Sequence, residues 1–202
     1  MTLADGNALP DDGLADDGLP AAGVLHADAV GVLGRWTPPD AEQARLREYY
    51  QRHLAAYDDA MTRARLPEHL TASALVVDRA GERVLLTLHG KIHRWLQLGG
   101  HCEPGDQTLA GAALREATEE SGLPGLTIGD QPLLLSRHQV RCGGRDDAFH
   151  LDVQYLVRSG ADEAFVVSSE SSDLAWFPIE RLPAGIDASV AELARRAREL
   201  VG

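Results

Sequence analysis

The segment Leu98–Leu123, LGGHCEPGDQTLAGAALREATEESGL, decides the fold of this chain. It holds a Gly-rich loop followed by a stretch rich in Ala, Leu and Glu, and such a stretch predicts a helix. The predicted helix runs from about Thr108 to Ser121, and Gly122 is a natural residue to end it. Its small apolar residues share one face, which can pack on a sheet: Ala110, Ala113, Leu114 and Ala117.

Three glutamates occupy the opposite face of this helix. Glu116, Glu119 and Glu120 stand at positions i, i+3 and i+4, so their carboxylates project together. Like charges repel one another, and Arg115 is the only basic residue nearby in the sequence. A hard divalent cation such as Mg²⁺ or Mn²⁺ would neutralise them, because oxygen ligands select such metals. A solvated acidic face is the competing interpretation for the helix taken alone.

The glycines before this helix favour the metal interpretation. Gly99, Gly100 and Gly105 permit tight turns and let a ligand approach the backbone closely. A loop of this kind can offer backbone carbonyls to a metal ion and amide groups to phosphate. We therefore interpret the loop and the helix as one functional unit.

This unit resembles the Nudix box, which reads G-x5-E-x7-R-E-U-x-E-E-x-G-U with U aliphatic. The segment 115–123, REATEESGL, matches the second half, with an alanine at the first aliphatic position. Gly100 and the segment 103–106, EPGD, match the first half. The chain departs from the box in two respects. Asp106 replaces the first glutamate, and eight residues rather than seven separate Asp106 from Arg115, so the loop must absorb one extra residue.

The resemblance to the Nudix family implies an α/β fold for residues 68–202, a three-layer α/β/α sandwich around a mixed sheet. It also implies a metal-dependent hydrolase with a small nucleotide substrate, a nucleoside diphosphate linked to another group. Water would attack phosphorus and cleave the diphosphate (pyrophosphate) linkage, with Mg²⁺ or Mn²⁺ as the cofactor. The sequence does not identify which derivative is the substrate.

The same resemblance implies roles for single residues. The metal ligands would be Glu116, Glu119, Glu120 and the backbone carbonyl of Gly100. Arg115 would hold Glu116 in place, and Asp106 would hydrogen-bond around the metal shell. The catalytic base is a box glutamate in some family members and a glutamate of a later loop in others. Glu116 and Glu119 are therefore candidates, and so is Glu170 in the polar loop SSESSD, where an ordinary loop carboxylate is the alternative.

Three further residues are candidate substrate contacts. Lys91 and Arg94 precede the Gly-rich loop, where they can meet phosphate oxygens, although surface solubility is the competing interpretation. Asp152 shares one face of its predicted strand with His150, and that face can border the active cleft. His138, Cys142, His150 and Asp152 form a loose cluster in sequence, but their spacing matches no compact zinc pattern, and we do not predict a zinc site there.

The chain before residue 68 divides into two parts. Residues 1–22 are acidic and lack aromatic side chains, so we predict a flexible acidic tail. Residues 23–67 predict a helical extension, whose longer helix starts at Pro38 behind a Thr37 cap. This helix carries an apolar face formed by Leu46, Tyr49, Tyr50, Leu54 and Tyr57. The face packs either on its own domain or across a homodimer; we favour the homodimer, because Nudix family members often dimerise.

The remaining elements follow from runs of apolar residues and from helical periodicity. We predict a helix over 27–33, an end of the longer helix near 64, strands over 72–77, 83–88, 95–98, 132–135, 151–157 and 174–177, and a final helix over 188–200.

Composition and charge exclude several classes of protein. The chain has 202 residues, 44% of them hydrophobic and 25% charged, which fits one globular domain with an appendage. Its 19 basic and 31 acidic residues give a net charge of −12, which disfavours nucleic acids and anionic membranes as partners. No apolar run is long enough to span a membrane, and the N-terminus lacks the basic start of a signal peptide. We predict a cytoplasmic protein in which Cys102 and Cys142 stay reduced.

Two other functions stay open on the sequence. A catalytically inactive Nudix-like domain that senses a ligand often loses box glutamates or gains a basic DNA-binding module, whereas this chain keeps all three glutamates and is acidic. An isomerase of the isopentenyl-diphosphate type would need a catalytic cysteine, and Cys102 lies close to the glutamates in sequence. That branch does not usually keep the full hydrolytic box. Metal-dependent turnover of a nucleotide panel separates the three functions.

Overall fold

The computed structural model describes residues 23–90, 93–142, 144–166 and 171–201. The acidic tail predicted over 1–22 lies outside these residues. Within them the chain forms four helices, α1 (Val24–Arg35), α2 (Ala41–Ala56), α3 (Leu109–Ser121) and α4 (Ala188–Val201). The strands are β1 (Glu68–Val77), β2 (Arg83–His89), β3 (Trp95–Leu96), β4 (Leu98–His101), β5 (Thr127–Ile128), β6 (Leu134–Cys142), β7 (Arg145–Arg158) and β8 (Ser171–Pro178). No helix of the described residues has the length and apolar character to cross a membrane.

β1 organises the eight-stranded mixed sheet. It pairs with β7 in parallel along its whole length. On its other edge it pairs in antiparallel fashion first with β4, from Thr71 to Ala74, and then with β2, at Val76 and Val77. Since β1 changes partner on this edge, the sheet splits there between β4 and β2. Beyond β2 the sheet continues to β3 and β8, and on the opposite edge of β1 it continues through β7 to β5 and β6.

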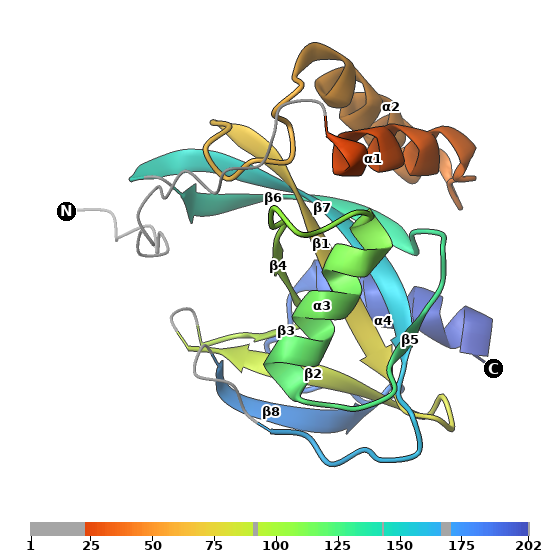
Figure 1. Cartoon of the computed structure of the whole chain (residues 1–202). Helices are drawn as coiled ribbons and strands as arrows, with labels where there is room; N and C mark the ends of the chain where they lie inside the picture. The colour runs from red at the N-terminus through yellow and green to blue at the C-terminus, as the bar shows by residue number, and fades with distance from the viewer. Residues whose placement is uncertain (1–22, 91–92, 143, 167–170, 202) are drawn as a thin grey trace.

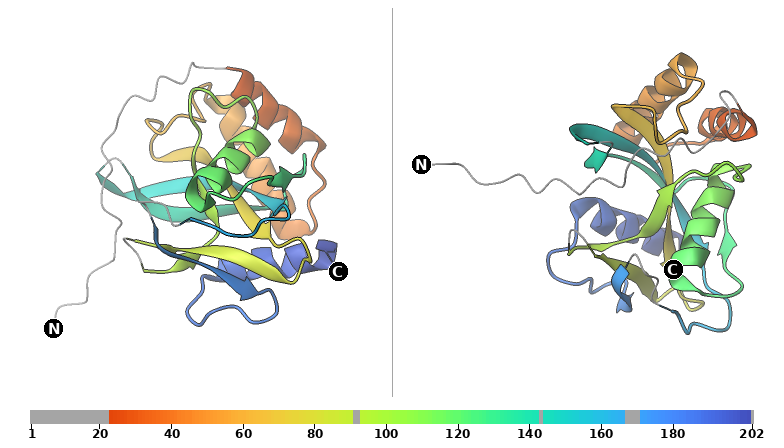
Figure 2. Two further views of the ribbon diagram at one scale, coloured as in Figure 1. Left: turned by 60° about the horizontal axis from the view of Figure 1, so that its bottom comes forward. Right: turned by 60° about the vertical axis from the view of Figure 1, so that its left-hand side comes forward.

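The two faces of the sheet are covered by different helices, as the right-hand view of Figure 2 shows, with α3 on one side and α4 on the other. Alternate residues of β1 point to opposite faces, as in any strand. Leu70, Ala72 and Ala74 belong to the core that also contains buried residues of α3, whereas Leu75 and Val77 belong to the core beneath α4. This arrangement confirms the predicted three-layer α/β/α fold with a mixed sheet.

The helical extension packs on the α3 side of the same chain, above β6 and β7 in Figure 1. Tyr50 and Leu54 are 0% and 1% exposed and belong to the same core as α3. The Tyr50 hydroxyl donates to the backbone oxygen of Ser136 at 2.9 Å. The side-chain amide of Gln43 accepts from the backbone N–H of Leu135 and donates to its carbonyl, at 2.7 and 3.0 Å. Gln43 thus satisfies backbone groups of β6 that the sheet leaves unpaired.

The structure corrects the predicted start and end of the longer helix. Asp40, not Thr37, caps α2, because its side chain accepts from the backbone N–H of Gln43 at 2.9 Å. The helix ends at Ala56 rather than near residue 64. Of its predicted apolar face, Tyr50 and Leu54 are buried within the chain, so these two residues cannot anchor a partner. The homodimer itself stays a prediction.

Most other elements lie near where the sequence predicts them, but β1 and β7 begin earlier, at Glu68 and Arg145 rather than at 72 and 151, and β5 is not predicted at all. The largest difference is in β6. The predicted strand over 132–135 is only its beginning, and the observed strand runs from Leu134 to Cys142. Its second part is polar, and in the register of the sheet it pairs with β7 alone. A strand paired on one edge needs little apolar sequence, and hydrophobic runs therefore do not reveal it.

The buried position of Leu54 gives a test of the extension. Leu54→Ala removes a side chain that is 1% exposed, and we expect the free energy of unfolding to fall by about 2–5 kcal/mol. Leu200→Ala serves as the control, because Leu200 is 65% exposed and its truncation should change stability by less than about 0.5 kcal/mol. Urea denaturation of both variants measures the difference. Equal stability of the two would show that the extension is not part of the cooperative core.

Candidate active site

The candidate active site is built on α3, and both ends of this helix are fixed. At the start, Thr108 accepts from the backbone N–H of Gly111 at 2.9 Å. Asp28 of α1 accepts from the backbone N–H of Leu109 at 2.8 Å, and a carboxylate is favourable at the positive end of a helix. At the other end Gly122 adopts a left-handed conformation with φ 65°. The extension therefore helps to hold the helix that carries the glutamates.

Two glycines let β4 and α3 approach closely. A Cβ atom on Gly100 would lie 2.7 Å from the Oε1 atom of Glu116. Gly99 has φ 150°, and a Cβ atom there would lie 2.4 Å from the Cβ atom of Ser73. Any side chain at these positions would collide with its neighbours, because real Cβ contacts are longer. The Gly100 position thus keeps open the space next to the Glu116 carboxylate.

Arg115 is the centre of the polar network. Its Nε and Nη2 atoms donate to the two carboxylate oxygens of Asp106, at 3.1 and 3.0 Å. Its Nη1 atom donates to Glu116 and to Glu119, each at 3.1 Å. Its Nη2 atom also donates to the backbone oxygen of His101 at 3.0 Å. One guanidinium therefore links the loop, the helix and β4, and the extra residue in the loop does not prevent Asp106 from reaching it.

Burial and neighbouring charges act strongly on Glu116. Its side chain is 15% exposed, and burial raises the pKa of this carboxyl to about 7. Arg115 opposes the rise, and Glu119 and Glu103 reinforce it through charge repulsion. A cation next to the Glu116 carboxyl would lower its pKa again and so restore the carboxylate form. The residues present are a buried glutamate beside Gly99 and Gly100 of β4, which we call the glycine cradle. They fit the divalent cation that the resemblance to the Nudix family implies.

The other two glutamates differ from Glu116 in their surroundings. The Glu119 side chain is 58% exposed. Glu120 lies closer to the strand, and its Oε1 atom accepts from the backbone N–H of Gly99 at 3.5 Å. Among the described residues these three carboxylates do not all come within 4.8 Å of one another. Arg115 holds two of them, and a cation would have to draw the set together.

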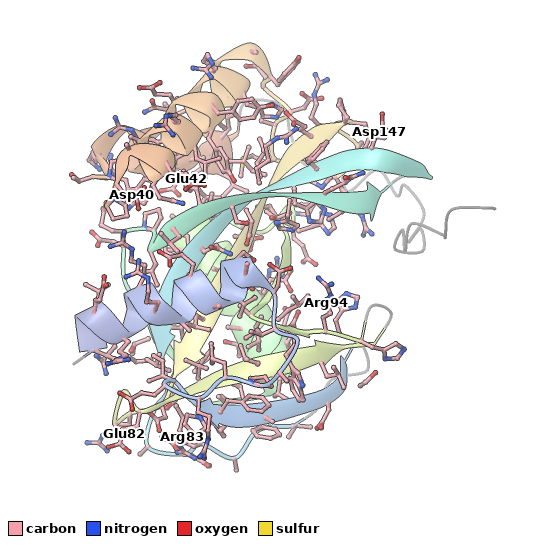
Figure 3. The ribbon with its side chains drawn as sticks, turned by 180° about the vertical axis from the view of Figure 1, so that it is seen from behind. Asp40, Glu42, Glu82, Arg83, Arg94 and Asp147 are labelled. Atoms are coloured by element: carbon pink, nitrogen blue, oxygen red, sulfur yellow. The ribbon has the colours of Figure 1, made fainter. Side chains whose placement is uncertain are left out.

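The predicted substrate contacts fall in different places. Arg94, labelled in Figure 3, lies before β3, and its side chain is 58% exposed and paired with Asp187 at 3.2 Å. Asp152 is 3% exposed, and its carboxylate accepts from Thr71 and Ser73 at 3.0 and 2.6 Å. Its direct contact with a substrate stays a prediction. Lys91 and Glu170 lie outside the described residues.

Cys102 is 1% exposed, and burial raises the pKa of its thiol far above the usual range. A thiol in this environment stays protonated at neutral pH and is a poor nucleophile. The side chain of Cys142 lies outside what the structure describes. The environment of Cys102 thus argues against an isomerase that uses it as a catalytic group.

The structure also reveals a cluster of histidines that the spacing of residues along the sequence did not indicate. The imidazole rings of His69, His101 and His150 lie within 4.9–5.1 Å of one another, centroid to centroid. His138 lies next to His150, with ring centroids 5.6 Å apart. Burial, with help from the other imidazoles, lowers the pKa of His150 well below its usual range. Only the pairing register of the strands could have brought these residues together, and hydrophobic periodicity does not specify that register.

Comparison with known proteins agrees with this architecture. The family model described as NUDIX domain matches residues 67–197. A NUDIX-family hydrolase from Clostridium perfringens shares 25% identity, with a TM-score of 0.55 over 66% of this chain and 98% of that one. An Ap4A hydrolase from C. elegans (21% identity, TM-score 0.53) covers 65% of this chain and 96% of its own length. The NUDIX domain of Shewanella oneidensis NrtR, in complex with ADP ribose, shares 21% identity with a TM-score of 0.51 over 75% and 97%. No curated protein matches the chain significantly.

The raised pKa of Glu116 predicts a pH-dependent stability in the metal-free protein. In the unfolded chain this carboxyl loses its proton near the ordinary value of 4.5, whereas in the folded protein it keeps the proton to about pH 7. Between these values the folded state binds more protons, so this group lowers the free energy of unfolding as pH rises. Glu116→Gln cannot titrate, and it should remove this decline and stabilise the protein at pH 8 by at most about 3 kcal/mol.

Denaturation at pH 5, 6, 7 and 8 in the presence of a chelator measures this effect. Glu48→Gln is the control, because Glu48 is an exposed carboxylate of α2. The control should keep the pH dependence of the unchanged protein. If Glu116→Gln shows the same decline as Glu48→Gln, then the Glu116 carboxyl is ionised in the folded protein.

Proposed function

The chain belongs to the Nudix family of hydrolases, and from this premise we propose that it cleaves the diphosphate linkage of a nucleoside diphosphate joined to another group. Water is the attacking group, and phosphorus is the atom attacked. The observation that carries this proposal is the Arg115 network. It holds Glu116 of the helix and Asp106 of the loop against the glycine cradle of β4.

Each side chain of the network has its own task in this proposal. Arg115 fixes the direction of Glu116, and Asp106 fixes Arg115 through two hydrogen bonds. Asp106 is itself held, because it accepts from the backbone N–H of Glu103 at 2.8 Å. The aspartate therefore takes over the position of the first box glutamate, although its side chain is one methylene shorter. The one extra residue in the loop is consistent with this exchange of a glutamate for a shorter aspartate.

Divalent metal is the cofactor of the proposed reaction. Glu116, Glu119, Glu120 and the carbonyl oxygen of Gly100 would hold it, and hard oxygen ligands of this kind suit Mg²⁺ or Mn²⁺. When bound, such an ion neutralises diphosphate oxygens and lowers the pKa of the attacking water. The chain itself contributes the orientation of the carboxylates and the space beside Gly100.

A carboxylate of the chain accepts the proton of the attacking water. Glu116 is held by Arg115 and lies beside the glycine cradle, a position that suits a ligand. Glu119 is more exposed and has greater freedom to contact water. Glu170 is the candidate from the later loop. Replacing each in turn and comparing the pH profiles of kcat distinguishes the base from the ligands, because only loss of the base removes the corresponding ionisation.

The proposed chemistry and the ligands of two similar structures support a proposal for the substrate class. The C. elegans protein is an Ap4A hydrolase, and the S. oneidensis domain binds ADP ribose. Both ligands contain adenosine phosphates, so we propose a small nucleotide of this general type. Lys91 and Arg94 would contact its phosphates. Asp152 would contribute indirectly by orienting Gln97, whose side-chain amide donates to the Asp152 carboxylate at 3.3 Å.

A ligand-sensing domain without catalysis is the second candidate. The NrtR domain that binds ADP ribose shares the fold, and this favours the idea. The three glutamates kept in the second half of the box and the arrangement around Arg115 favour the hydrolase. A sensor would bind nucleotides from a panel without converting them, whereas the hydrolase turns at least one of them over. A homodimer, which light scattering would detect, is compatible with both functions.

Metal removal and a ligand substitution test the proposed reaction. We expect hydrolysis to require Mg²⁺ or Mn²⁺, to stop in excess EDTA and to rise toward alkaline pH, since water is the nucleophile. Glu120→Gln should lower kcat by roughly 100-fold or more with little loss of fold, because the substitution removes a charge rather than volume. Glu48→Gln is again the matched control. Undiminished hydrolysis in EDTA would disprove metal dependence, and wild-type turnover by Glu120→Gln would exclude Glu120 from the site.

The contact of Arg94 with phosphate can be separated from its ion pair. Arg94→Ala should raise KM by about tenfold with kcat nearly unchanged, as expected for one charge-assisted hydrogen bond to the substrate. Asp187→Asn breaks the same ion pair but leaves the Arg94 charge in place. Steady-state kinetics on the first nucleotide that is turned over compare the two variants. If both raise KM equally, Arg94 acts by holding Asp187 and does not bind phosphate.

A further inference from the structure

Three histidines from three strands lie on one face of the sheet. His69 of β1 pairs with His150 of β7 in the strand register, and directly paired residues point to the same face. Thr71 lies two residues after His69 and therefore shares its face, and Thr71 pairs with His101 of β4. The histidine cluster, by which we mean His69, His101 and His150, is thus imposed by the register of β4, β1 and β7.

The histidine cluster and the acidic site lie on opposite faces of β4. Gly100 faces the Glu116 carboxylate, as the position of its missing Cβ atom shows. His101 is the next residue, and its side chain points to the other face. The cluster therefore does not share the glutamates of α3. It also differs from them in chemistry, since it offers ring nitrogens rather than carboxylate oxygens.

The spacing of the rings matches that of imidazoles around one metal ion. Bound through nitrogens at about 2.0–2.1 Å, a tetrahedral zinc ion lies roughly 3.2 Å from each ring centroid, which places the centroids about 5.2 Å apart. The observed separations are 5.1, 4.9 and 4.9 Å. One ring nitrogen from each histidine lies within 4.8 Å of those of the other two. Small rotations of the rings would bring these atoms to the distance of about 3.4 Å that a tetrahedral ion requires.

The surroundings of two of the rings also fit metal ligands. The Nδ1 atom of His69 lies 3.1 Å from the backbone oxygen of Arg65, so this nitrogen carries the proton and Nε2 carries the lone pair. Metal-binding histidines commonly make such a second hydrogen bond to a carbonyl group. The Nε2 atom of His150 is shielded from solvent and has no hydrogen-bond partner within the described part of the chain. A buried polar atom of this kind needs a partner, and a metal ion supplies one.

We propose that His69, His101 and His150 bind one transition-metal ion of the zinc class, at a site distinct from the acidic site on α3. Imidazole is a borderline ligand that suits Zn²⁺, whereas Mg²⁺ and Mn²⁺ prefer oxygen. Three protein ligands leave the fourth position of a tetrahedral ion for water or for another group. The ion joins β1, β4 and β7 at one point. It therefore braces the strand that presents Gly100, without taking part in the chemistry proposed for the glutamates.

The first experiment uses the full chain and needs no histidine variant. The protein is stripped of metal with a chelator, dialysed and titrated with Zn²⁺ by calorimetry, and elemental analysis gives the amount bound. The double variant Glu116→Gln/Glu120→Gln is titrated alongside, because it weakens zinc binding at the acidic site. We expect one tightly bound Zn²⁺ per chain in both proteins and a higher Tm with zinc, since binding to the folded state stabilises it. Co²⁺ in place of Zn²⁺ should give the visible absorption bands of tetrahedral nitrogen coordination.

Single substitutions then assign the ligands. His101→Gln and His150→Gln are preferred over changes at His69, because His69 is 0% exposed and its replacement disturbs packing. Each should weaken zinc binding by more than about 100-fold, because loss of a ligand costs more than loss of a group that only hydrogen-bonds to a ligand, which costs up to about 100-fold. Exposed His93 has φ 50°, and His93→Asn is the control, because asparagine tolerates this conformation. The control should bind zinc as the unchanged protein does.

Several results would overturn the proposal. One is the absence of bound Zn²⁺ in the unchanged protein, and another is an octahedral Co²⁺ spectrum; neither depends on how a variant folds. Zinc binding that disappears in the double glutamate variant would place the ion at the acidic site instead. Unchanged affinity in folded His101→Gln and His150→Gln would exclude the cluster. Loss of nucleotide hydrolysis in the glutamate variant, with zinc still bound, supports this proposal and tests the proposed function separately.

Discussion

The ion pair between Arg115 and Asp106 is the interaction on which the candidate site depends. It connects a residue of the loop to a residue of the helix through two parallel hydrogen bonds, a geometry that fixes both partners. The Asp106 side chain is 7% exposed and that of Arg115 is 20% exposed, so neither charge is fully hydrated. Removing one partner would leave the other partly buried and uncompensated, which is costly. The remaining bonds of Arg115, to Glu116, Glu119 and the carbonyl of His101, depend on this placement.

The split of the sheet and the helical extension place this network in space. β1 pairs with β4 before it changes its partner to β2, and the pairing with β4 places Gly100 beside Glu116 of α3. The extension holds α3 from the other side, since Asp28 of α1 accepts from the first backbone N–H of the helix. Gln43 and Tyr50 of α2 bind backbone groups of β6 and β7. The extension is therefore part of the structure that positions the glutamates.

β4 separates two kinds of chemistry by the simple alternation of a strand. Gly100 faces carboxylates, which suit hard cations, and His101 faces imidazoles, which suit zinc. The glutamates come from one helix and follow one another closely in sequence. The histidines come from three strands, and they are up to 81 residues apart along the chain, as the pairing of His69 with His150 shows. The acidic site is thus a local feature, whereas the histidine cluster is a product of the sheet.

The sequence by itself determined the helix α3, the clustering of its glutamates and the loop glycines, because helical spacing and glycine conformation are local properties. It also determined the layered fold, through the order of strands and helices. Tertiary structure decided that Tyr50 and Leu54 are buried in their own chain and that a polar segment extends β6. It decided as well that Asp152 is enclosed by Thr71 and Ser73, and that the histidines meet. These features depend on strand register and on packing between distant segments, which residue spacing along a chain does not specify.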